Sequence, residues 1–214
     1  MNALGILEVY SFTTAVCAAD IAAKAADVKV IAFDRTRPKS EAVPAPLVMA
    51  LKIEGDNSSV KAAIEAASTY AKDKGDYIIS SVMPRPGTDM EKMAYLLDIN
   101  KDKYNKKLPK NFIGNEDELP VTDFSIGLIE VSGLVASIAG LDAMLKAASV
   151  RLIHTEKRLG GRLVTLIVKG KVSDVKAAIE AGVETAKPLG KVHGNEVIAN
   201  PHGEILKFFD YDVD

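Results

Sequence analysis

The stretch Val60-Lys61-Ala62-Ala63-Ile64-Glu65-Ala66 occurs a second time, unchanged, at residues 175–181 of this 214-residue chain. At the same offset of 115, Ser58 matches Ser173 and Pro86 matches Pro201. Nearer the N-terminus the offset is 122, with Gly5 on Gly127, Glu8 on Glu130, Asp20 on Asp142 and Lys24 on Lys146. Such self-similarity indicates a tandem duplication. Because the offsets differ by seven, the first copy carries seven additional residues between positions 31 and 58.

Both copies show the same order of expected elements. Apolar strands at 4–9 and 126–131 precede alanine-rich helices that end near 24–26 and 146–148. Strands follow at 28–33 and 150–154, then at 46–53 and 163–168, and the last of these is almost wholly apolar, which predicts burial on both faces. Second helices run to about residues 73 and 187, and the last strands are expected at 77–83 and 196–199. The order β-α-β-β-α-β predicts an α/β protein of the α+β, ferredoxin-like kind.

Capping residues help to predict where the second helix of each copy begins and ends. Ser58 and Ser173 are predicted as N-caps, because a serine oxygen can accept the free N–H groups of a first turn. Gly75 is predicted to end the helix of the first copy.

Three regions are expected along the chain. The first copy occupies residues 1–87 and the second 121–214. Residues 88–120 form a linker, in which an amphipathic stretch at 89–97 predicts a short helix and the remainder is polar and broken by prolines and a glycine.

Composition narrows the function classes. A content of 48% hydrophobic and 26% charged residues is ordinary for a globular protein, and a net charge of −2 argues against a general nucleic-acid binder. The longest apolar run, 131–141, is too short to cross a bilayer, and the N-terminus lacks the basic start of a secretory signal. One cysteine, Cys17, fits a reducing cytoplasm and is expected in the core. We therefore expect no membrane and no nucleic-acid partner.

No catalytic or metal-binding pattern emerges from the residues. His154, His193 and His202 lack metal-ligand spacing, and there is no Gly-x-Ser-x-Gly elbow or Cys/His pair. No cofactor is expected.

The stretch Glu156-Lys157-Arg158-Leu159-Gly160-Gly161-Arg162 raises a separate question, since glycines beside basic residues can cradle a phosphate. A phosphate-binding loop leads into a helix N-terminus, whereas a strand follows here. The stretch is therefore predicted as the tip of a hairpin.

Several motifs together resemble bacterial microcompartment shell proteins. They are GLIEV at 127–131, DAMLKAASVRL at 142–152, the glycine tip before LVTLIVKGKVSDV at 163–175, VIANPH at 197–202, and in the first copy GILEV at 5–9, SSVKAAIEAA at 58–67 and VMPRP at 82–86. The resemblance covers nearly the whole chain outside the linker and the loop at 34–46. Two unpermuted copies resemble the tandem-domain class, and this implies a homotrimer that imitates a hexamer in the shell of a cytoplasmic microcompartment. A small-molecule sensor or enzyme on duplicated ferredoxin-like halves is the alternative.

The resemblance implies that the tips between the second and third strands line a central pore. The family's usual tip is Lys-Ile-Gly-Ser-Gly, so Arg162 stands where a glycine is usual. The implied pore-lining residues are Arg35, Arg37, Pro38, Lys39, Ser40, Glu41, Arg158, Leu159, Gly160, Gly161 and Arg162. The formal charge is +2 over 156–162 and +1 over 34–46, so small anionic metabolites are expected at the pore. Pairing of the arginines with Glu156 or Glu41 is the alternative.

The resemblance also implies residues that contact neighbouring tiles. A lysine late in the first helix and an arginine at the exit of the last strand lie at the tile edge in this family. Here these positions are Lys24, Lys146 and Arg85, with Asn200 in place of the second arginine. Solvated surface lysines are the alternative reading. Other shell proteins are the partners expected at the edges.

Overall fold

The computed structural model describes residues 3–36, 47–87, 122–160 and 162–209, with the backbone alone at 157 and 158. The first copy contains β1 (Ala3–Val9), α1 (Phe12–Ala25), β2 (Val28–Thr36), β3 (Val48–Gly55), α2 (Asn57–Asp73) and β4 (Tyr77–Met83). The second contains β5 (Ser125–Ser132), α4 (Leu134–Ala147), β6 (Val150–Gly160), β7 (Leu163–Gly170), α5 (Val172–Ala186) and β8 (Val192–Ala199), and the short helix α6 (Gly203–Leu206) follows. The predicted helix at 89–97 lies outside the described residues.

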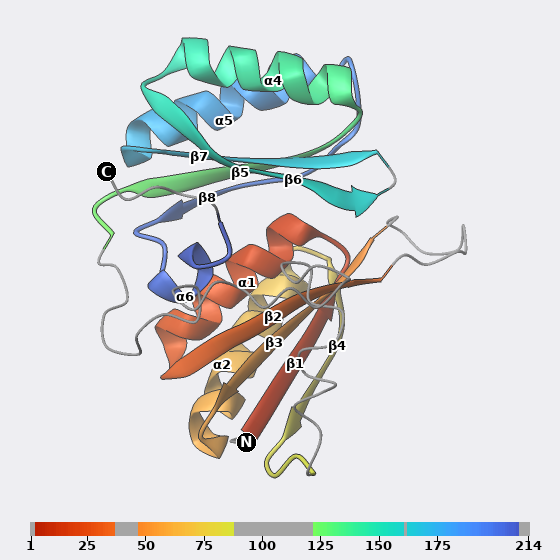
Figure 1. Ribbon diagram of the computed structural model, residues 1–214, viewed down its shortest axis with the longest axis vertical. Coiled ribbons are helices and arrows are strands. Elements are labelled where there is room, and N and C mark those ends of the chain that lie inside the picture. The colour runs from red at the N-terminus through yellow and green to blue at the C-terminus, as the bar shows by residue number, and fades with distance from the viewer. Residues whose placement is uncertain (1–2, 37–46, 88–121, 161, 210–214) are drawn as a thin grey trace, which may run out of the picture. The chain divides into compact units, whose positions relative to one another are not determined.

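Each copy forms one antiparallel sheet with the ferredoxin-like strand order. The orders are β2-β3-β1-β4 and β6-β7-β5-β8, so the first strand of each copy is central and pairs with the third and the fourth. Two helices pack side by side on one face of each sheet (Figure 1). The predicted fold class is therefore confirmed, and both copies keep the unpermuted order.

The contact pattern groups the chain into two compact units. Unit 1 contains residues 1–120 together with His202–Phe208, and unit 2 contains residues 121–201 together with 209–214. The short helix α6 thus follows the last strand of the second copy but packs on α1 and β2 of the first (Figure 1). The boundaries predicted at residues 87 and 120 remain predictions.

The repeated heptapeptide sits where helix and sheet come closest. A Cβ atom added to Gly5 in β1 would lie 2.7 Å from Ile64 Cγ1 and 2.8 Å from Val60 Cγ1. The same holds in unit 2, where a Cβ on Gly127 would lie 2.7 Å from both Ile179 and Val175. Real Cβ atoms do not approach carbon so closely, so only glycine lets α2 and α5 lie this near the central strands.

Several elements run longer than the sequence predicts. The strand β6 extends to Gly160 instead of residue 154, β2 extends to Thr36 instead of residue 33, and β8 begins at Val192 instead of residue 196. Most of their additional residues are charged or polar, and none of the extensions contains an apolar run. Hydrogen bonding to the neighbouring strand extends these strands, and this cannot be predicted from residue type alone. Residues 163–168 are all buried, as predicted.

The predicted N-caps are wrong. In α2 the cap is Asp56, whose carboxylate accepts N–H groups from Ser58 and Ser59 at 2.8 and 3.0 Å. The hydrogen bond from the Ser58 hydroxyl and those of Ser59 lower the pKa of Asp56 from 3.8 to about 2. In α5 the cap position is Lys171, which makes no side-chain cap bond, so Ser173 lies inside the helix. Gly75 follows the end of α2 with φ of 75°, as predicted for a helix-terminating glycine.

The glycine contacts give the first testable prediction. Gly127→Ala should lower the free energy of unfolding by about 1–3 kcal/mol, because the new methyl group overpacks the contact between β5 and α5. Gly5→Ala should behave alike. Chemical denaturation checks this, with Gly87→Ala as the control, since Gly87 is exposed and nothing lies within 4 Å of its added Cβ. Equal stability of all three variants would contradict the role assigned to the close approach.

Candidate functional site

The predicted tip in unit 2 is a hairpin. The strands β6 and β7 pair up to Gly160 opposite Leu163, with an irregular register between Glu156 and Gly160. Gly160 has φ of 86° and Arg162 has φ of 64°, both in the left-handed region. Arg162 therefore adopts a backbone conformation that favours glycine, at the position where the family usually has glycine. The prediction of a hairpin tip in place of a phosphate cradle is confirmed.

Arg162 is anchored to the start of the neighbouring helix. The Gly133 N–H donates to the Arg162 carbonyl oxygen at 2.9 Å, and a Cβ on Gly133 would lie 3.5 Å from Arg162 Nη2. Gly133 is the N-cap of α4. The side chain of Arg162 is exposed, whereas Leu159 is buried beneath the tip.

A row of buried polar residues crosses the sheet below this tip. Thr165 of β7 lies opposite Glu130 of β5 on one side and Glu156 of β6 on the other, and all three are at most 1% exposed. His154 Nε2 lies 4.0 Å from Glu156, and its ring contacts that of Phe209. Glu156 thus belongs to the interior of unit 2 and not to the surface of the tip.

Unit 1 repeats the backbone arrangement with different side chains. Ala50 of β3 lies opposite Glu8 of β1 and Asp34 of β2, at the positions that match Glu130 and Glu156. Asp34 is buried and forms an ion pair with the largely buried Lys52. The offset of 122 relates Asp34 to Glu156, and the sequence predicts both as charged residues of the loops, with Glu156 as a possible partner of the arginines. Their burial could not be read from residue type.

The structure describes only some of the other residues predicted to line the pore. Arg35 is half-buried at the end of β2, and β2 and β3 flank the enlarged loop as predicted. Outside the described residues lie Arg37, Pro38, Lys39, Ser40, Glu41 and Gly161, together with the side chain of Arg158.

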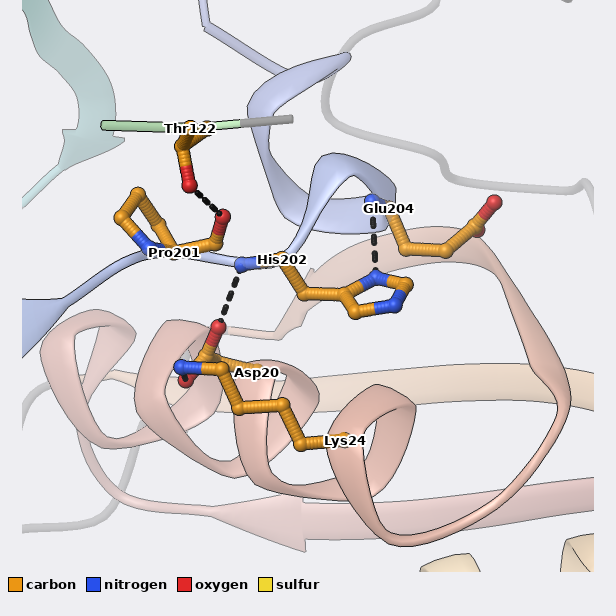
Figure 2. Close-up of polar contacts among 6 residues, drawn as sticks. All are labelled: Asp20, Lys24, Thr122, Pro201, His202 and Glu204. Carbon is orange, nitrogen blue, oxygen red and sulfur yellow. Dashed lines mark hydrogen bonds and ion pairs between the residues drawn. The ribbon is translucent and has the colours of Figure 1, made fainter. Parts of the chain in front are cut away.

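The predicted edge lysines occupy matching places and have local partners. Lys24 Nζ lies 2.6 Å from Asp20, and Lys146 Nζ lies 2.6 Å from Asp142, each pair one helical turn apart in α1 and α4. Asp20 also accepts the His202 backbone N–H at 2.7 Å (Figure 2), and its side chain is 6% exposed against 59% for Asp142.

The two predicted edge residues beyond the last strands are exposed. Arg85 follows β4, and Asn200 follows β8 with a left-handed φ of 47°.

The described residues give little support to a catalytic or metal-binding site. Within the described ranges, no three His, Cys, Asp or Glu residues form a group that could hold a metal ion. Burial, and then the charge of Lys191, lower the pKa of His193, which shares a hydrogen bond of 2.8 Å with the Ser132 hydroxyl. Cys17 is buried, as predicted. None of the helices in the described part of the chain is long and apolar enough to span a bilayer.

Comparison with known proteins identifies the fold of both copies. The family model of the BMC domain matches residues 3–86 and again residues 125–201. The carboxysome assembly protein CcmO of Synechococcus elongatus is 32% identical over 205 residues, which cover 96% of this chain and 67% of that protein.

Two shell proteins match over a length close to that of one copy. The bacterial microcompartment shell protein PduA of Salmonella typhimurium is 45% identical over 83 residues, which cover 39% of this chain and 87% of PduA. The shell protein EutM of Escherichia coli is 44% identical over 85 residues, which cover 40% of this chain and 87% of EutM. These relatives are shell and assembly proteins, so the alternative of a sensor or enzyme is not favoured. The chain therefore belongs to the BMC-domain family, as a structural shell protein of bacterial microcompartments with two BMC domains in tandem.

Proposed function

We propose that three copies of this chain close into a flat ring of six BMC domains, a shell tile with a pore on its axis. The alignments with PduA and EutM span most of those proteins but only about two fifths of this chain. Each chain thus supplies two shell-protein units, for which we propose the boundaries 1–87 and 121–214 with residues 88–120 as the linker. Closed cyclic symmetry is the usual solution for an assembly of identical chains.

The proposed pore is lined by the two kinds of hairpin loop, between β6 and β7 and between β2 and β3. The observation that carries its selectivity is the burial of the acidic residue at the base of each hairpin. Glu156 lies inside unit 2 and Asp34 is neutralised by Lys52, whereas Arg162 is exposed at the tip. Neither acid is on the surface to offset the basic residues of the loops.

An excess of positive charge on a symmetry axis favours small anions. Threefold repetition multiplies the charge, and the low-dielectric walls of a narrow opening focus the field. The guanidinium group suits carboxylates and phosphates, because its planar fork donates two parallel hydrogen bonds. The pore is therefore proposed to pass small anionic metabolites, with Arg158 and Arg162 as the residues that meet them.

The second testable prediction reverses this charge. Arg162→Glu, alone and with Arg158→Glu, should slow the entry of a small dicarboxylate such as succinate into reconstituted shells at least about tenfold, because like charge now repels it. Entry of neutral glycerol should change little.

The matched control is Lys187→Glu, which makes the same change of charge at an exposed position at the end of α5. If succinate entry falls equally in the control, or is unchanged in both Arg162 variants, the proposed selectivity is wrong.

The third prediction separates the backbone of the tip from its charge. Arg162→Gly should be about 1 kcal/mol more stable than Arg162→Ala, because only glycine adopts φ of 64° without a Cβ clash. Both variants remove the same charge and should alter succinate entry alike. Urea denaturation measures the first difference, and equal stability of the two variants would contradict the strain assigned to this residue.

The chain assembles with other shell proteins, and we propose that the contacts run through Lys24, Lys146, Arg85 and Asn200. Each lysine lies in the last turn of its helix, where its ammonium group forms an ion pair with an aspartate one turn earlier. Arg85 and Asn200 are exposed at matching exits of the last strands.

The fourth prediction tests this edge. Lys24→Ala combined with Lys146→Ala should leave the oligomer intact but abolish the extended sheets that tiles form in electron micrographs. Lys61→Ala with Lys176→Ala is the control, since these exposed lysines are likewise related by the repeat but lie on α2 and α5. Sheets of normal extent from the first variant, or sheets lost from both, would exclude the proposed edge.

A further inference from the structure

The hairpin tip of unit 2 is held by a glycine at the end of the neighbouring strand. The Gly133 N–H donates to the Arg162 carbonyl oxygen at 2.9 Å, next to the pair that Ser132 of β5 forms with Leu163 of β7. Gly133 has φ of 102°, a backbone conformation that L side chains rarely adopt. The residue that holds the carbonyl of Arg162 is thus one whose conformation requires glycine.

The backbone on both sides of Gly133 is fixed within unit 2. The Ser132 N–H donates to the Lys191 carbonyl oxygen at 2.9 Å, and the Ser132 hydroxyl shares a hydrogen bond of 2.8 Å with His193. On the other side, the buried Ser137 donates to the Gly133 carbonyl oxygen from its hydroxyl at 2.7 Å and from its N–H at 3.1 Å. Because the Gly133 carbonyl is held in α4, a change of φ at this residue would reorient its N–H relative to the tip.

The side chain of Arg162 lies beside the same glycine. A Cβ atom added to Gly133 would lie 3.5 Å from Arg162 Nη2, which is van der Waals contact. The guanidinium group, which is exposed to solvent on its other side, therefore lies next to the start of α4. A side chain at residue 133 would compete with it for this space. Both the carbonyl and the charged group of Arg162 thus depend on what stands at residue 133.

The matching residue of unit 1 has a different role. At the offset of 122 Gly133 corresponds to Ser11, which is 3% exposed and has φ of −137°. The Ser11 hydroxyl accepts the Thr14 N–H at 3.3 Å and caps α1. In unit 2, the cap residue of α4 makes no side-chain cap bond, although such a bond stabilises a helix. The second copy therefore lacks a capping side chain at the point where its tip carries Arg162.

We infer that Gly133 is a positioning residue for the pore, because it sets where the guanidinium group of Arg162 lies. Its N–H fixes the carbonyl of Arg162, and the absence of a side chain leaves room for the guanidinium group. The attraction between two charges falls as they separate, so a displaced guanidinium group attracts an anion in the pore less strongly. The inference rests on the proposed function and adds a residue, outside the hairpin itself, on which the selection of anions depends.

The fifth prediction replaces this glycine and measures selectivity. Gly133→Ala should lower the ratio of succinate entry to glycerol entry in reconstituted shells at least about threefold, because relief of the strained φ moves the tip and its charge. In an Arg162→Gly background, the same substitution should leave the ratio unchanged, since no guanidinium group remains to be displaced. A merely structural role of Gly133 would alter the ratio equally in both backgrounds.

The matched control is Gly75→Ala. Gly75 also has a positive φ, of 75°, and nothing lies within 4 Å of its added Cβ. This substitution strains the backbone of unit 1 without touching the tip of unit 2. It should lower the midpoint of urea denaturation and leave the ratio of succinate entry to glycerol entry unchanged.

A second variant keeps the glycine and serves if Gly133→Ala does not assemble into shells. Ser137→Ala removes the hydroxyl that donates to the Gly133 carbonyl but leaves the backbone hydrogen bond of α4. It should lower the ratio of succinate entry to glycerol entry in the presence of Arg162 and leave it unchanged in the Arg162→Gly background.

The outcomes separate the inference from the proposed function. If Arg162→Gly lowers the ratio but the substitutions at Gly133 and Ser137 do not, the positioning role is wrong and the proposed selectivity stands. If these substitutions lower the ratio equally with and without Arg162, the inference is likewise overturned. If Arg162→Gly itself leaves the ratio unchanged, the proposed selectivity fails, and the inference fails with it.

Discussion

Both units depend on one steric constraint, the contact between a helix and a central strand at Gly5 and Gly127. Valine and isoleucine of the repeated heptapeptide press on a strand position where no side chain fits. This close approach seats α2 and α5 on their sheets and fixes which residues of the helices face inward. The alanines of the heptapeptide then fill the shallow space, as the buried Ala63 and Ala178 show. Because tight packing restricts substitutions at these contacts, the hairpin tips and helix ends are the positions where the sequences of the two copies could diverge.

The fold could be predicted well from the sequence because each helix and strand occurs twice, so that two different stretches of sequence indicate the same element. The strand β4 at Tyr77–Met83 and the end of α2 at Asp73 agree with the predicted bounds. The predicted cap of α2 failed because the carboxylate of Asp56, two residues before Ser58, accepts the free N–H groups instead. The predicted cap of α5 failed because that helix begins at Val172, before Ser173. The burial of Glu156 and Asp34 could not be predicted from the sequence, for another reason. It depends on neighbouring strands, which the residue itself does not reveal.

Divergence between the copies has separated the roles of equivalent residues. Asp20 and Asp142 each pair with a lysine one turn away, and Asp20 also accepts the backbone N–H of His202. The first hairpin carries an enlarged loop and an acid neutralised by Lys52, whereas the second carries an arginine in a conformation suited to glycine. A single-copy shell protein repeats one set of contacts at every position. A tandem chain can assign different contacts to alternate positions.

The packing of residues His202–Phe208 on unit 1 has a consequence for biosynthesis. A ribosome makes the first copy well before residues 202–208, and domains ordinarily fold as they emerge. Here Val30 of the edge strand β2 and the buried Asp20 gain their bonds to Glu204 and His202 only after the whole second copy has been made. Until then, the first copy exposes an uncovered strand edge, the feature that promotes unwanted pairing with other chains. A chain that stops before residue 202 would therefore lack part of the cover on its first unit.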